Sequence, residues 1–334
     1  MAFFCGMLLL LWPMTTQADE SPLEIQPVPA DNQNDEVSGY FDLSVEPGQQ
    51  QTIELQVTNN TQEGLILKGE TVNAYTHPSG GMLYGSNIDS ERALLLEDAV
   101  RLADYMEVEE EISVPPESSV NVPVDITVPE VEQGTLLGAV NLTTEPTTQM
   151  EEAAEEDAAN FILNTETTYS VAVQLNLPGE VPTDFSLGEA GFISNTAEIY
   201  IEMTNQAQMI QENIKGTYTV SDETGTELFS GDIPTFKMAP NSAIQYGIPW
   251  EHESLEDGEY TLTVSGTAGT EQFAATETFT IANDDVQAYA ERNMPEVNTP
   301  SSQGIPVWAW VLGAVVFGVL MLFAGRKMAG GKSE

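Results

Sequence analysis

Chemistry in proteins usually depends on a few residue types, and this chain holds them in very unequal numbers. It has two histidines, His77 and His252, and one cysteine, Cys5, against 53 Asp and Glu residues. A zinc site or a Ser-His-Asp triad needs several such residues close together, and the two histidines lie far apart in the sequence. There is no P-loop and no GxGxxG turn between a strand and a helix. We therefore expect no enzyme, no metal site and no other cofactor.

The carboxylates are informative through their total charge rather than through any one pair. Glu109, Glu110 and Glu111, for example, are more typical of a solvated strand or turn than of a glycosidase acid and base. With nine Lys and Arg, the formal net charge is −44. This charge excludes nucleic acid as a partner, because phosphate binding needs clustered basic residues. Basic proteins and divalent cations are the natural electrostatic partners. The carboxylates also repel one another, so we expect added salt to stabilise the protein.

Two apolar segments near the ends of the chain indicate where the rest of it lies. The first, residues 2–14, precedes Thr16 and Ala18, which suit cleavage of a signal peptide 1–18, although no basic residue begins it. The second, residues 305–325, spans about 31 Å at about 1.5 Å per residue, close to the hydrocarbon core of a bilayer. The sequence therefore predicts a secreted chain with one C-terminal transmembrane helix.

The residues around the second segment give its orientation. Trp308 and Trp310 suit the outer membrane interface, and Arg326 follows at the other end. By the positive-inside rule, residues 326–334 form a short cytoplasmic tail. The predicted protein is thus a single-pass protein of the cell membrane whose ectodomain faces the cell wall.

Residues 294–304, rich in Pro, Ser and Asn, form a predicted stalk between the membrane and the folded part of the ectodomain. The only cysteine belongs to the signal peptide, so the mature chain has no disulfide. A cysteine-free ectodomain with one C-terminal anchor fits a Gram-positive cell surface best.

Between its ends the chain alternates apolar and polar residues, as half-buried strands do. Clear examples are TIELQVTNN, SVNVPVDITV, TYSVAVQLNL, AEIYIEMTN and EYTLTVSGT. Many short strands separated by Gly, Pro and Asn turns indicate antiparallel sandwiches. We predict an all-β fold of two tandem immunoglobulin-like antiparallel β-sandwich domains, residues 23–145 and 163–293. An acidic linker or loop, residues 146–162, joins them.

Helical signals are few. Asn283–Arg292 begins with a capping Asn and two Asp that suit the positive end of a helix dipole, and it is predicted to end the second domain. Ser90–Met106 is predicted to hold one or two helical turns with Ser90 as the N-cap.

An internal repeat relates the two predicted domains. The segments VPPESSVNVPV and MAPNSAIQYGI align so that Pro116 meets Pro240 and the apolar positions that follow coincide. Eighteen residues after each proline stands a glycine, Gly134 or Gly258, that precedes another strand. We infer two sandwiches of the same construction, in which the Pro-Asn-Ser of the second segment is a turn.

Taken together, these segments resemble the WxL-interacting proteins of Gram-positive bacteria. The first half is similar to their peptidoglycan-binding domain through PVPADNQ, GYFDLSVEPGQQQTIELQVTNNT, NAYTHPSGGMLY and VPEVEQGTLLGAV. The second half is similar to their WxL- and host-binding domain through YSVAVQL, KMAPNSAIQYGIPW, DGEYTLTV and FTIANDDVQAYAER. The resemblance covers nearly the whole chain, and its specificity lies in the order and spacing of the pieces.

The resemblance implies a non-catalytic cell-surface adaptor. Its first domain would bind peptidoglycan, and its second would bind a secreted WxL-domain protein, with a host extracellular matrix protein as a further class of partner. A second hypothesis, of another class, is a structural stalk or an acidic surface-display or secretion component without specific wall binding. The enzyme hypothesis ranks third.

For the implied peptidoglycan site, aromatic faces beside amide and hydroxyl groups are needed, since sugars are apolar on one face and polar at the rim. Asn73, Tyr75, His77 and Tyr84 flank one Gly-rich turn and supply that mixture. The alternative is that the tyrosines are core or edge residues of a hairpin. His77 stands where the family commonly has Asn, which leaves the role of this loop open.

For the implied partner site, an exposed sheet edge with apolar anchors is expected. Pro123 and Pro249 are typical of sheet edges, because proline cannot donate a ladder hydrogen bond. Tyr246, Ile248 and Trp250 lie on the second of these strands and are the candidate anchors. The alternative places all three in the core of the second sandwich.

Overall fold

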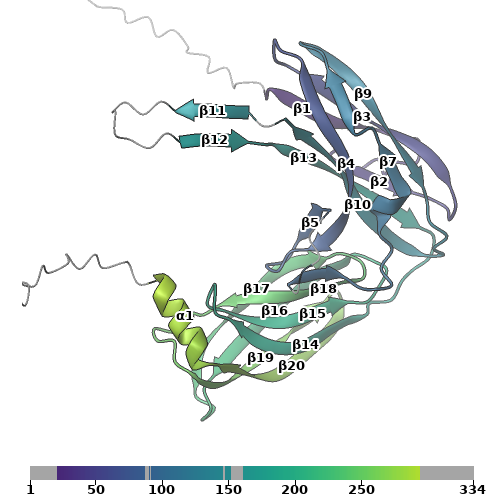
Figure 1. Ribbon diagram of the computed structural model, residues 1–334. Coiled ribbons are helices and arrows are strands. Elements are labelled where there is room, and N and C mark those ends of the chain that lie inside the picture. The colour runs from purple at the N-terminus through teal and green to yellow at the C-terminus, as the bar shows by residue number, and fades with distance from the viewer. Residues whose placement is uncertain (1–20, 87–89, 91, 146, 152–160, 294–334) are drawn as a thin grey trace, which may run out of the picture. The chain divides into compact units, whose positions relative to one another are not determined.

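The computed structural model describes residues 21–86, 90, 92–145, 147–151 and 161–293 (Figure 1). In that part of the chain, secondary structure is almost entirely β, with one short 3-10 helix and one α-helix. The predicted all-β class is thereby confirmed. The predicted signal peptide, stalk, transmembrane helix and cytoplasmic tail lie outside the described residues. Within those residues, no helix is long and apolar enough to cross a membrane.

Two sheets build the first sandwich. One is antiparallel, with the order β1 (Leu23–Val28), β3 (Gln50–Asn59), β9 (Ser118–Thr127) and β7 (Met106–Val108). The other has the order β2 (Phe41–Ser44), β13 (Thr168–Leu177), β10 (Gly134–Thr144), β4 (Leu65–Thr76) and β5 (Met82–Gly85), with β8 (Glu111–Val114) also paired to β4. Alternate apolar residues of these strands, such as Leu55 and Val173, pack together in one core.

The second sandwich likewise consists of two sheets, and each of these has four strands. The first has the order β14 (Phe185–Ile193), β15 (Glu198–Asn205), β18 (Ser242–Pro249) and β6 (Ala93–Leu95). The second has the order β17 (Glu227–Met238), β16 (Gln211–Ser221), β19 (Gly258–Ala268) and β20 (Glu271–Ile281). Their core contains Ile201 and Val264 among other fully buried side chains.

The two sandwiches have the same construction, as the repeat predicts. The row β1-β3-β9-β7 of the first corresponds to β14-β15-β18-β6 of the second, and the row β13-β10-β4-β8 corresponds to β20-β19-β16-β17. Gly134 and Gly258 begin the equivalent strands β10 and β19.

A buried asparagine holds the same corner of each sandwich. Asn59 and Asn205, at the ends of β3 and β15, have no solvent exposure. The Asn59 amide donates to the carbonyl of Pro115 at 3.1 Å, and the Asn205 amide donates to the carbonyl of Ala239 at 2.9 Å. Each side-chain oxygen accepts an N–H from two residues further along. These bonds satisfy backbone groups that the turns would otherwise leave unpaired.

The turn at this corner is also the same in both sandwiches. Glu117 and Asn241 have φ of 47° and 45°, the left-handed region, directly before β9 and β18. The hydroxyl groups of Ser118 and Ser242 each donate to the carbonyl three residues earlier, at 2.8 Å. The predicted Pro-Asn-Ser turn is thereby confirmed.

The prolines Pro123 and Pro249 lie on strands that have neighbours on both sides, so neither strand is a sheet edge over its whole length. β7 pairs with Val124–Ile126, and β6 pairs with Ser242–Ile244. Each proline lies beyond the end of the shorter neighbour, where no ladder bond is needed on that side. The prediction of a sheet edge therefore holds only for the part of each strand that contains the proline.

Two strands lie in the sandwich opposite to the predicted division of the chain. β13, within the predicted range 163–293, pairs along its length with β10 and completes the first sandwich. β6, within the predicted range 23–145, pairs with β18 and completes a sheet of the second. Each sandwich therefore contains sequence from both predicted ranges.

The predicted linker, residues 146–162, contains strand structure. β11 (Thr147–Glu151) and β12 (Phe161–Thr165) form an antiparallel ladder. The reason is that β10 and β13 are antiparallel neighbours, so the segment between them continues their hairpin.

The helix predictions have mixed outcomes. α1 (Asn283–Asn293) forms where a helix is predicted. Residues 90–106 hold one helical turn, η1 (Leu102–Tyr105), which is 3-10, but Ser90 as its N-cap is wrong, because Ala93–Leu95 is strand β6 and Arg101 precedes the turn. Ala93–Leu95 pairs with the backbone groups of β18. This tertiary pairing outweighs the local helical preference of the segment.

Candidate functional site

Asn73 and Tyr75, two of the predicted peptidoglycan-binding residues, lie on β4 on the same face of its sheet. The Asn73 side-chain oxygen accepts a hydrogen bond from the N–H of Ala103 at 3.0 Å, which ties η1 to β4. Tyr75 is 2% exposed. These contacts agree with the alternative that the pair is structural.

Tyr84 lies on the opposite face of the same sheet. It pairs with Ala74 across β4 and β5, and neighbouring residues of a strand point to opposite sides. Burial raises the pKa of the Tyr84 phenol to about 12, and the nearby Tyr40 phenol adds to the effect. The four predicted residues therefore do not converge on one site.

His77 is exposed in the turn between β4 and β5. Its Nδ1 lies 3.1 Å from the Ser79 N–H and 2.7 Å from the Ser79 hydroxyl. Its carbonyl accepts the N–H of Gly80 at 2.7 Å. The imidazole thus closes the turn, a role that Asn also performs well because its side chain bonds to backbone two residues on.

Tyr84 lines a small hollow of about 170 Å³, which is formed by this face of the first sandwich together with Ile210 and Lys237 of the second. The lining residues are two tyrosines, four apolar residues, an amide and an amine: Tyr40, Tyr84, Met82, Leu137, Ala172, Ile210, Gln174 and Lys237. Gln174 Nε2 donates to Asp42 at 3.0 Å, and Lys237 Nζ lies 2.5 Å from a Glu212 carboxylate oxygen.

Of the residues that line this hollow, only Tyr84 was predicted from the sequence as a site residue. Tyr40 stands directly before the buried strand β2 and is 36% exposed. Tyr40 could have been selected as an exposed aromatic residue that stands next to a buried strand. Lys237 gives no such signal, because it lies on β17 of the second sandwich and reaches the hollow only where the two sandwiches meet.

The predicted partner-binding residues Tyr246 and Ile248 point into the core of the second sandwich. They are 7% and 1% exposed. The Tyr246 ring stacks on Phe236 with centroids 5.3 Å apart. Trp250 is partly buried in an aromatic cluster, with its ring centroid 5.2 Å from Tyr260 and 5.4 Å from Phe229. Tyr246 and Ile248 are therefore core residues and Trp250 is partly buried against the same core, which agrees with the alternative that places them in the core of the second sandwich.

The backbone N–H groups of β18 on the side away from β15 are also hydrogen-bonded. Beyond the β6 pairs, the N–H of Gln245 donates to the Arg92 carbonyl at 3.0 Å, and the N–H of Gly247 donates to the Pro78 carbonyl at 3.1 Å. The next residue that could donate on this side is Pro249, which has no N–H. A partner strand therefore finds no open ladder along β18.

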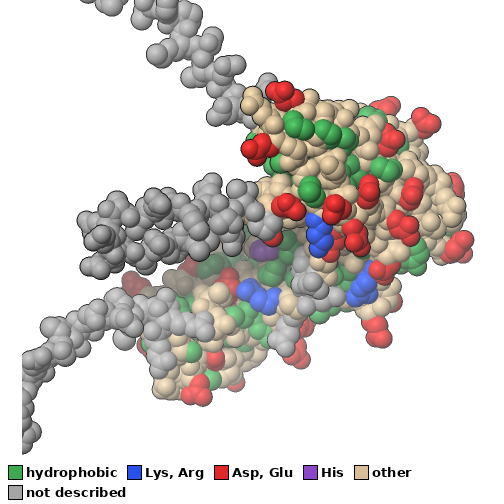
Figure 2. Space-filling model, turned by 45° about the horizontal axis from the view of Figure 1, so that its top comes forward, with side chains coloured by type: hydrophobic (Ala, Val, Ile, Leu, Met, Phe, Trp, Pro, Cys, Tyr) green, Lys and Arg blue, Asp and Glu red, His purple; other side chains and the backbone are tan. Residues whose placement is uncertain are grey.

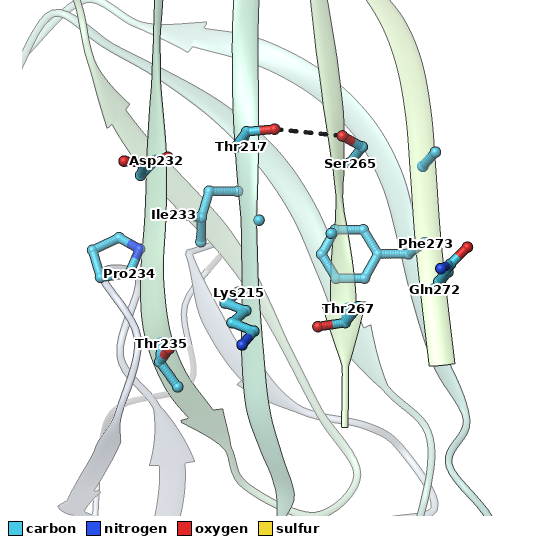
Figure 3. Close-up of a pocket in the computed structure, with 13 residues that line it drawn as sticks. Lys215, Thr217, Asp232, Ile233, Pro234, Thr235, Ser265, Thr267, Gln272 and Phe273 are labelled. Carbon is cyan, nitrogen blue, oxygen red and sulfur yellow. Dashed lines mark hydrogen bonds between the residues drawn. The ribbon is translucent and has the colours of Figure 1, made fainter. Parts of the chain in front are cut away.

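The second sandwich carries an open groove of about 740 Å³ on the sheet formed by β17, β16, β19 and β20 (Figure 3). Figure 3 shows Thr217 and Ser265 facing each other across two strands, with their hydroxyl groups 3.4 Å apart. Gly216 and Gly266 lie opposite each other, and a Cβ on Gly266 would come within 2.1 Å of the Lys215 carbonyl. Close backbones and short hydroxyl side chains thus form a shallow, mostly uncharged surface.

On the face shown in Figure 2, Asp and Glu side chains are scattered over the surface and outnumber Lys and Arg. Among the described residues, no group of three or more His, Cys, Asp or Glu side chains could hold a metal ion. His77 bonds to Ser79, and His252 bonds to Ser254, so the two histidines serve separate turns. These arrangements offer hydrogen bonding and aromatic contact rather than a nucleophile and base.

Comparisons with known proteins give the following matches. A family model described as "WxL Interacting Protein, peptidoglycan binding domain" matches residues 23–144, and one described as "WxL Interacting Protein, host binding domain" matches residues 159–291. Both families are binding domains. A comparison with curated proteins finds no match.

Several solved bacterial chaperones are similar at low identity. The Pseudomonas aeruginosa CupB2 chaperone is 8% identical, with 73% of this chain and 100% of that chain covered and a TM-score of 0.28. The Escherichia coli chaperone DraB is 13% identical, with 78% and 95% covered and a TM-score of 0.30. The Salmonella enterica SafA pilin in complex with the SafB chaperone is 10% identical, with 79% and 99% covered and a TM-score of 0.33.

Proposed function

The chain belongs to the WxL-interacting protein family, and we propose that it is a non-catalytic cell-surface adaptor. Peptidoglycan binds to the first domain, and a secreted WxL-domain protein binds to the second. A host extracellular matrix protein is a further class of partner for the second domain. The observation that carries this proposal is the presence of both family domains in one chain, in that order.

We also propose how the adaptor is held at the wall. The signal peptide 1–18 directs secretion, and residues 305–325 span the membrane with the tail 326–334 in the cytoplasm. The stalk 294–304 then keeps the two binding domains outside the membrane, close to the wall. The apolar length and the basic residues of the C-terminal segment support this arrangement.

The adaptor proposal is tested by bridging. Purified full chain, a secreted WxL-domain protein and insoluble peptidoglycan are mixed, and the sediment is assayed for both proteins. We expect the full chain to sediment with peptidoglycan and to increase the sedimented WxL-domain protein above the level seen without it. If the full chain remains in the supernatant, wall binding is refuted. If it sediments but brings no additional WxL-domain protein, the adaptor role is refuted.

The groove of the second sandwich is the surface we propose for the protein partner, since the β18 residues are buried. Ala274→Arg places a long side chain in the groove, whereas Thr278→Arg lies on the same face of β20 outside it. We expect Ala274→Arg to weaken capture of the WxL-domain protein at least about ten-fold, a cost of about 1.4 kcal/mol. Thr278→Arg is the matched control, and equal capture by both variants removes the groove from the proposal.

A further inference from the structure

We infer that the hollow between Tyr40 and Tyr84 is a subsite for one N-acetylated sugar ring of the wall glycan. This inference rests on the proposed peptidoglycan binding and names the part of the polymer that the first domain holds. The lining combines two aromatic rings, an apolar floor, a fixed amide and a neutralised amine. Each of these features corresponds to a part of an acetamido sugar.

The aromatic walls suit the ring of a sugar. Tyr84 sits on β5, which pairs with β4, and Tyr40 directly precedes β2. The C–H face of a hexose packs well on a tyrosine ring, because the ring offers a flat apolar surface with a polar hydroxyl at its tip. Tyr40 is 36% exposed, so one of the two rings is available to an incoming ligand at low cost in reorganisation.

The apolar floor suits the methyl group of an acetamide. Leu137 is 8% exposed and does not belong to the core cluster of the first sandwich. It lines the hollow with Met82, Ala172 and Ile210. Apolar side chains that line a surface hollow outside the core are available for ligand contact, where a methyl group gains by leaving water.

The polar rim suits the amide and hydroxyl groups of the sugar. Gln174 is held in place, because its Nε2 donates to Asp42 and Asn176 at 3.0 Å each. A side chain fixed in this way loses little entropy when it bonds to a ligand. The Tyr84 hydroxyl is protonated throughout the physiological range, as a tyrosine with an ordinary pKa of about 10 is, so it can donate to a ligand.

The charge of the hollow favours a neutral ligand over a carboxylate of the peptide stems. Lys237 is the one cation in its lining, and its ammonium group is already paired with Glu212 at 2.5 Å. A carboxylate would therefore compete with an existing ion pair in a chain of net charge −44. An acetamido sugar has no such cost.

The size of the hollow limits the ligand to one ring. Its volume of about 170 Å³ is below the roughly 300 Å³ at which pockets for drug-sized ligands begin. A glycan strand would therefore place one residue in the hollow and run across the surface on either side.

The test uses the purified full chain and insoluble peptidoglycan, with soluble competitors. The competitors are the tetramer of β-1,4-linked N-acetylglucosamine, the tetramer of β-1,4-linked glucose, and a dipeptide ending in D-alanine. Tyr40→Ala is the main variant, and Tyr105→Ala is its matched control, because Tyr105 is 40% exposed and lies outside the hollow. Tyr84→Ala serves as a second variant, with its folding checked by circular dichroism.

We expect the N-acetylglucosamine tetramer to displace the chain and the glucose tetramer and dipeptide to have little effect. We expect Tyr40→Ala to weaken retention about ten-fold, as the loss of one aromatic contact worth about 1.4 kcal/mol would do, and Tyr105→Ala to leave it unchanged. Unchanged retention of Tyr40→Ala and of folded Tyr84→Ala overturns the hollow as the subsite. Equal displacement by both tetramers, or displacement by the dipeptide, overturns the acetamido sugar as its ligand. Failure of the unmodified chain to sediment refutes the proposed peptidoglycan binding itself.

Discussion

At the scale of single residues, the most informative pair is Asn59 and Asn205. Both are fully buried, and both bond to the turn that precedes the next strand of their sandwich. A buried amide with every group satisfied stabilises one geometry of that turn, because any other geometry leaves polar groups unpaired. The two residues therefore fix equivalent corners in two domains of different sequence.

We predict that Asn205→Ala destabilises the second sandwich by about 2–4 kcal/mol, because several hydrogen bonds are lost and buried backbone groups remain unpaired. The effect is measured by urea unfolding of a fragment 21–293, with fluorescence as the readout. Trp250 is the only tryptophan in that fragment and lies in the second sandwich. Gln272→Ala, at an exposed position of the second sandwich, is the control and should shift the midpoint little. Equal midpoints for the two variants would contradict this role.

Tyrosines give the protein a predictable sensitivity to alkali. Burial raises the pKa values of Tyr84, Tyr218, Tyr246 and Tyr260, that of Tyr84 to about 12. In the unfolded chain a phenol ionises near pH 10, so the unfolded state loses its protons first as the pH rises. The stabilising contribution is complete below pH 10 and is lost as the pH rises toward the folded pKa values.

We therefore predict that the urea midpoint of the fragment falls between pH 9 and pH 11, and that Tyr84→Phe reduces the fall. Phenylalanine preserves most of the packing but cannot ionise. A midpoint independent of pH in this range would show that these phenols ionise in the folded state as easily as in the unfolded one.

The sequence identified Tyr84 as a candidate residue but did not identify the hollow that it lines. Tyr84 could be chosen from its type and its neighbouring turn. Tyr40 and Leu137 could not be grouped with it, because β2 and β10 join its sheet only through long-range pairing, and Lys237 lies on β17 in a sheet of the other sandwich. Tyr246 and Ile248 had the expected alternation, but period two indicates that one face is buried and does not say which.

At the scale of elements, strands were predictable wherever one face is buried and the other is exposed to solvent. β3, β9, β13, β15 and β19 follow that alternation in both sequence and structure. β6 was not predictable, since its three residues become a strand only because β18 offers unpaired backbone groups. The assignment of β13 to the first sandwich was not predictable either, because its partner β10 lies on the other side of the predicted linker in the sequence.

The dependence of the second sandwich on β6 is testable by truncation. A fragment 178–293 keeps β14 to β20 but lacks β6, so the side of β18 is open and Ala93 is missing from the core. We predict that this fragment associates through the open strand or is less stable than the fragment 21–293, because unpaired strand edges recruit other chains. Size-exclusion chromatography with light scattering and urea unfolding give the answer. A monomeric fragment 178–293 of undiminished stability would mean that β6 is dispensable.

At the scale of the whole molecule, charge is the dominant feature. Ion pairs such as Arg92–Glu198 at 2.9 Å are formed by scarce basic residues, and most carboxylates have no cation to pair with. Salt weakens such surface pairs slightly but also screens the repulsion among carboxylates. With 53 acidic against nine basic residues, the relief of repulsion is the larger effect.

We accordingly predict that the melting temperature of the fragment 21–293 rises between low salt and 1 M NaCl. Differential scanning calorimetry measures the change, and tetramethylammonium chloride in place of NaCl separates general screening from specific binding of sodium. A flat or falling melting temperature would indicate that the carboxylates are spaced widely enough for their repulsion to be unimportant.

The position of β6 has a consequence for how this architecture is inherited. A short segment near residue 94 completes a sheet whose other strands are encoded about 100 residues later and beyond. A recombination event that replaced only one half of the gene would leave β18 beside a segment that had not been selected to match it. A change in either half therefore acts on the fit between β6 and β18, so packing ties the two halves of the chain together.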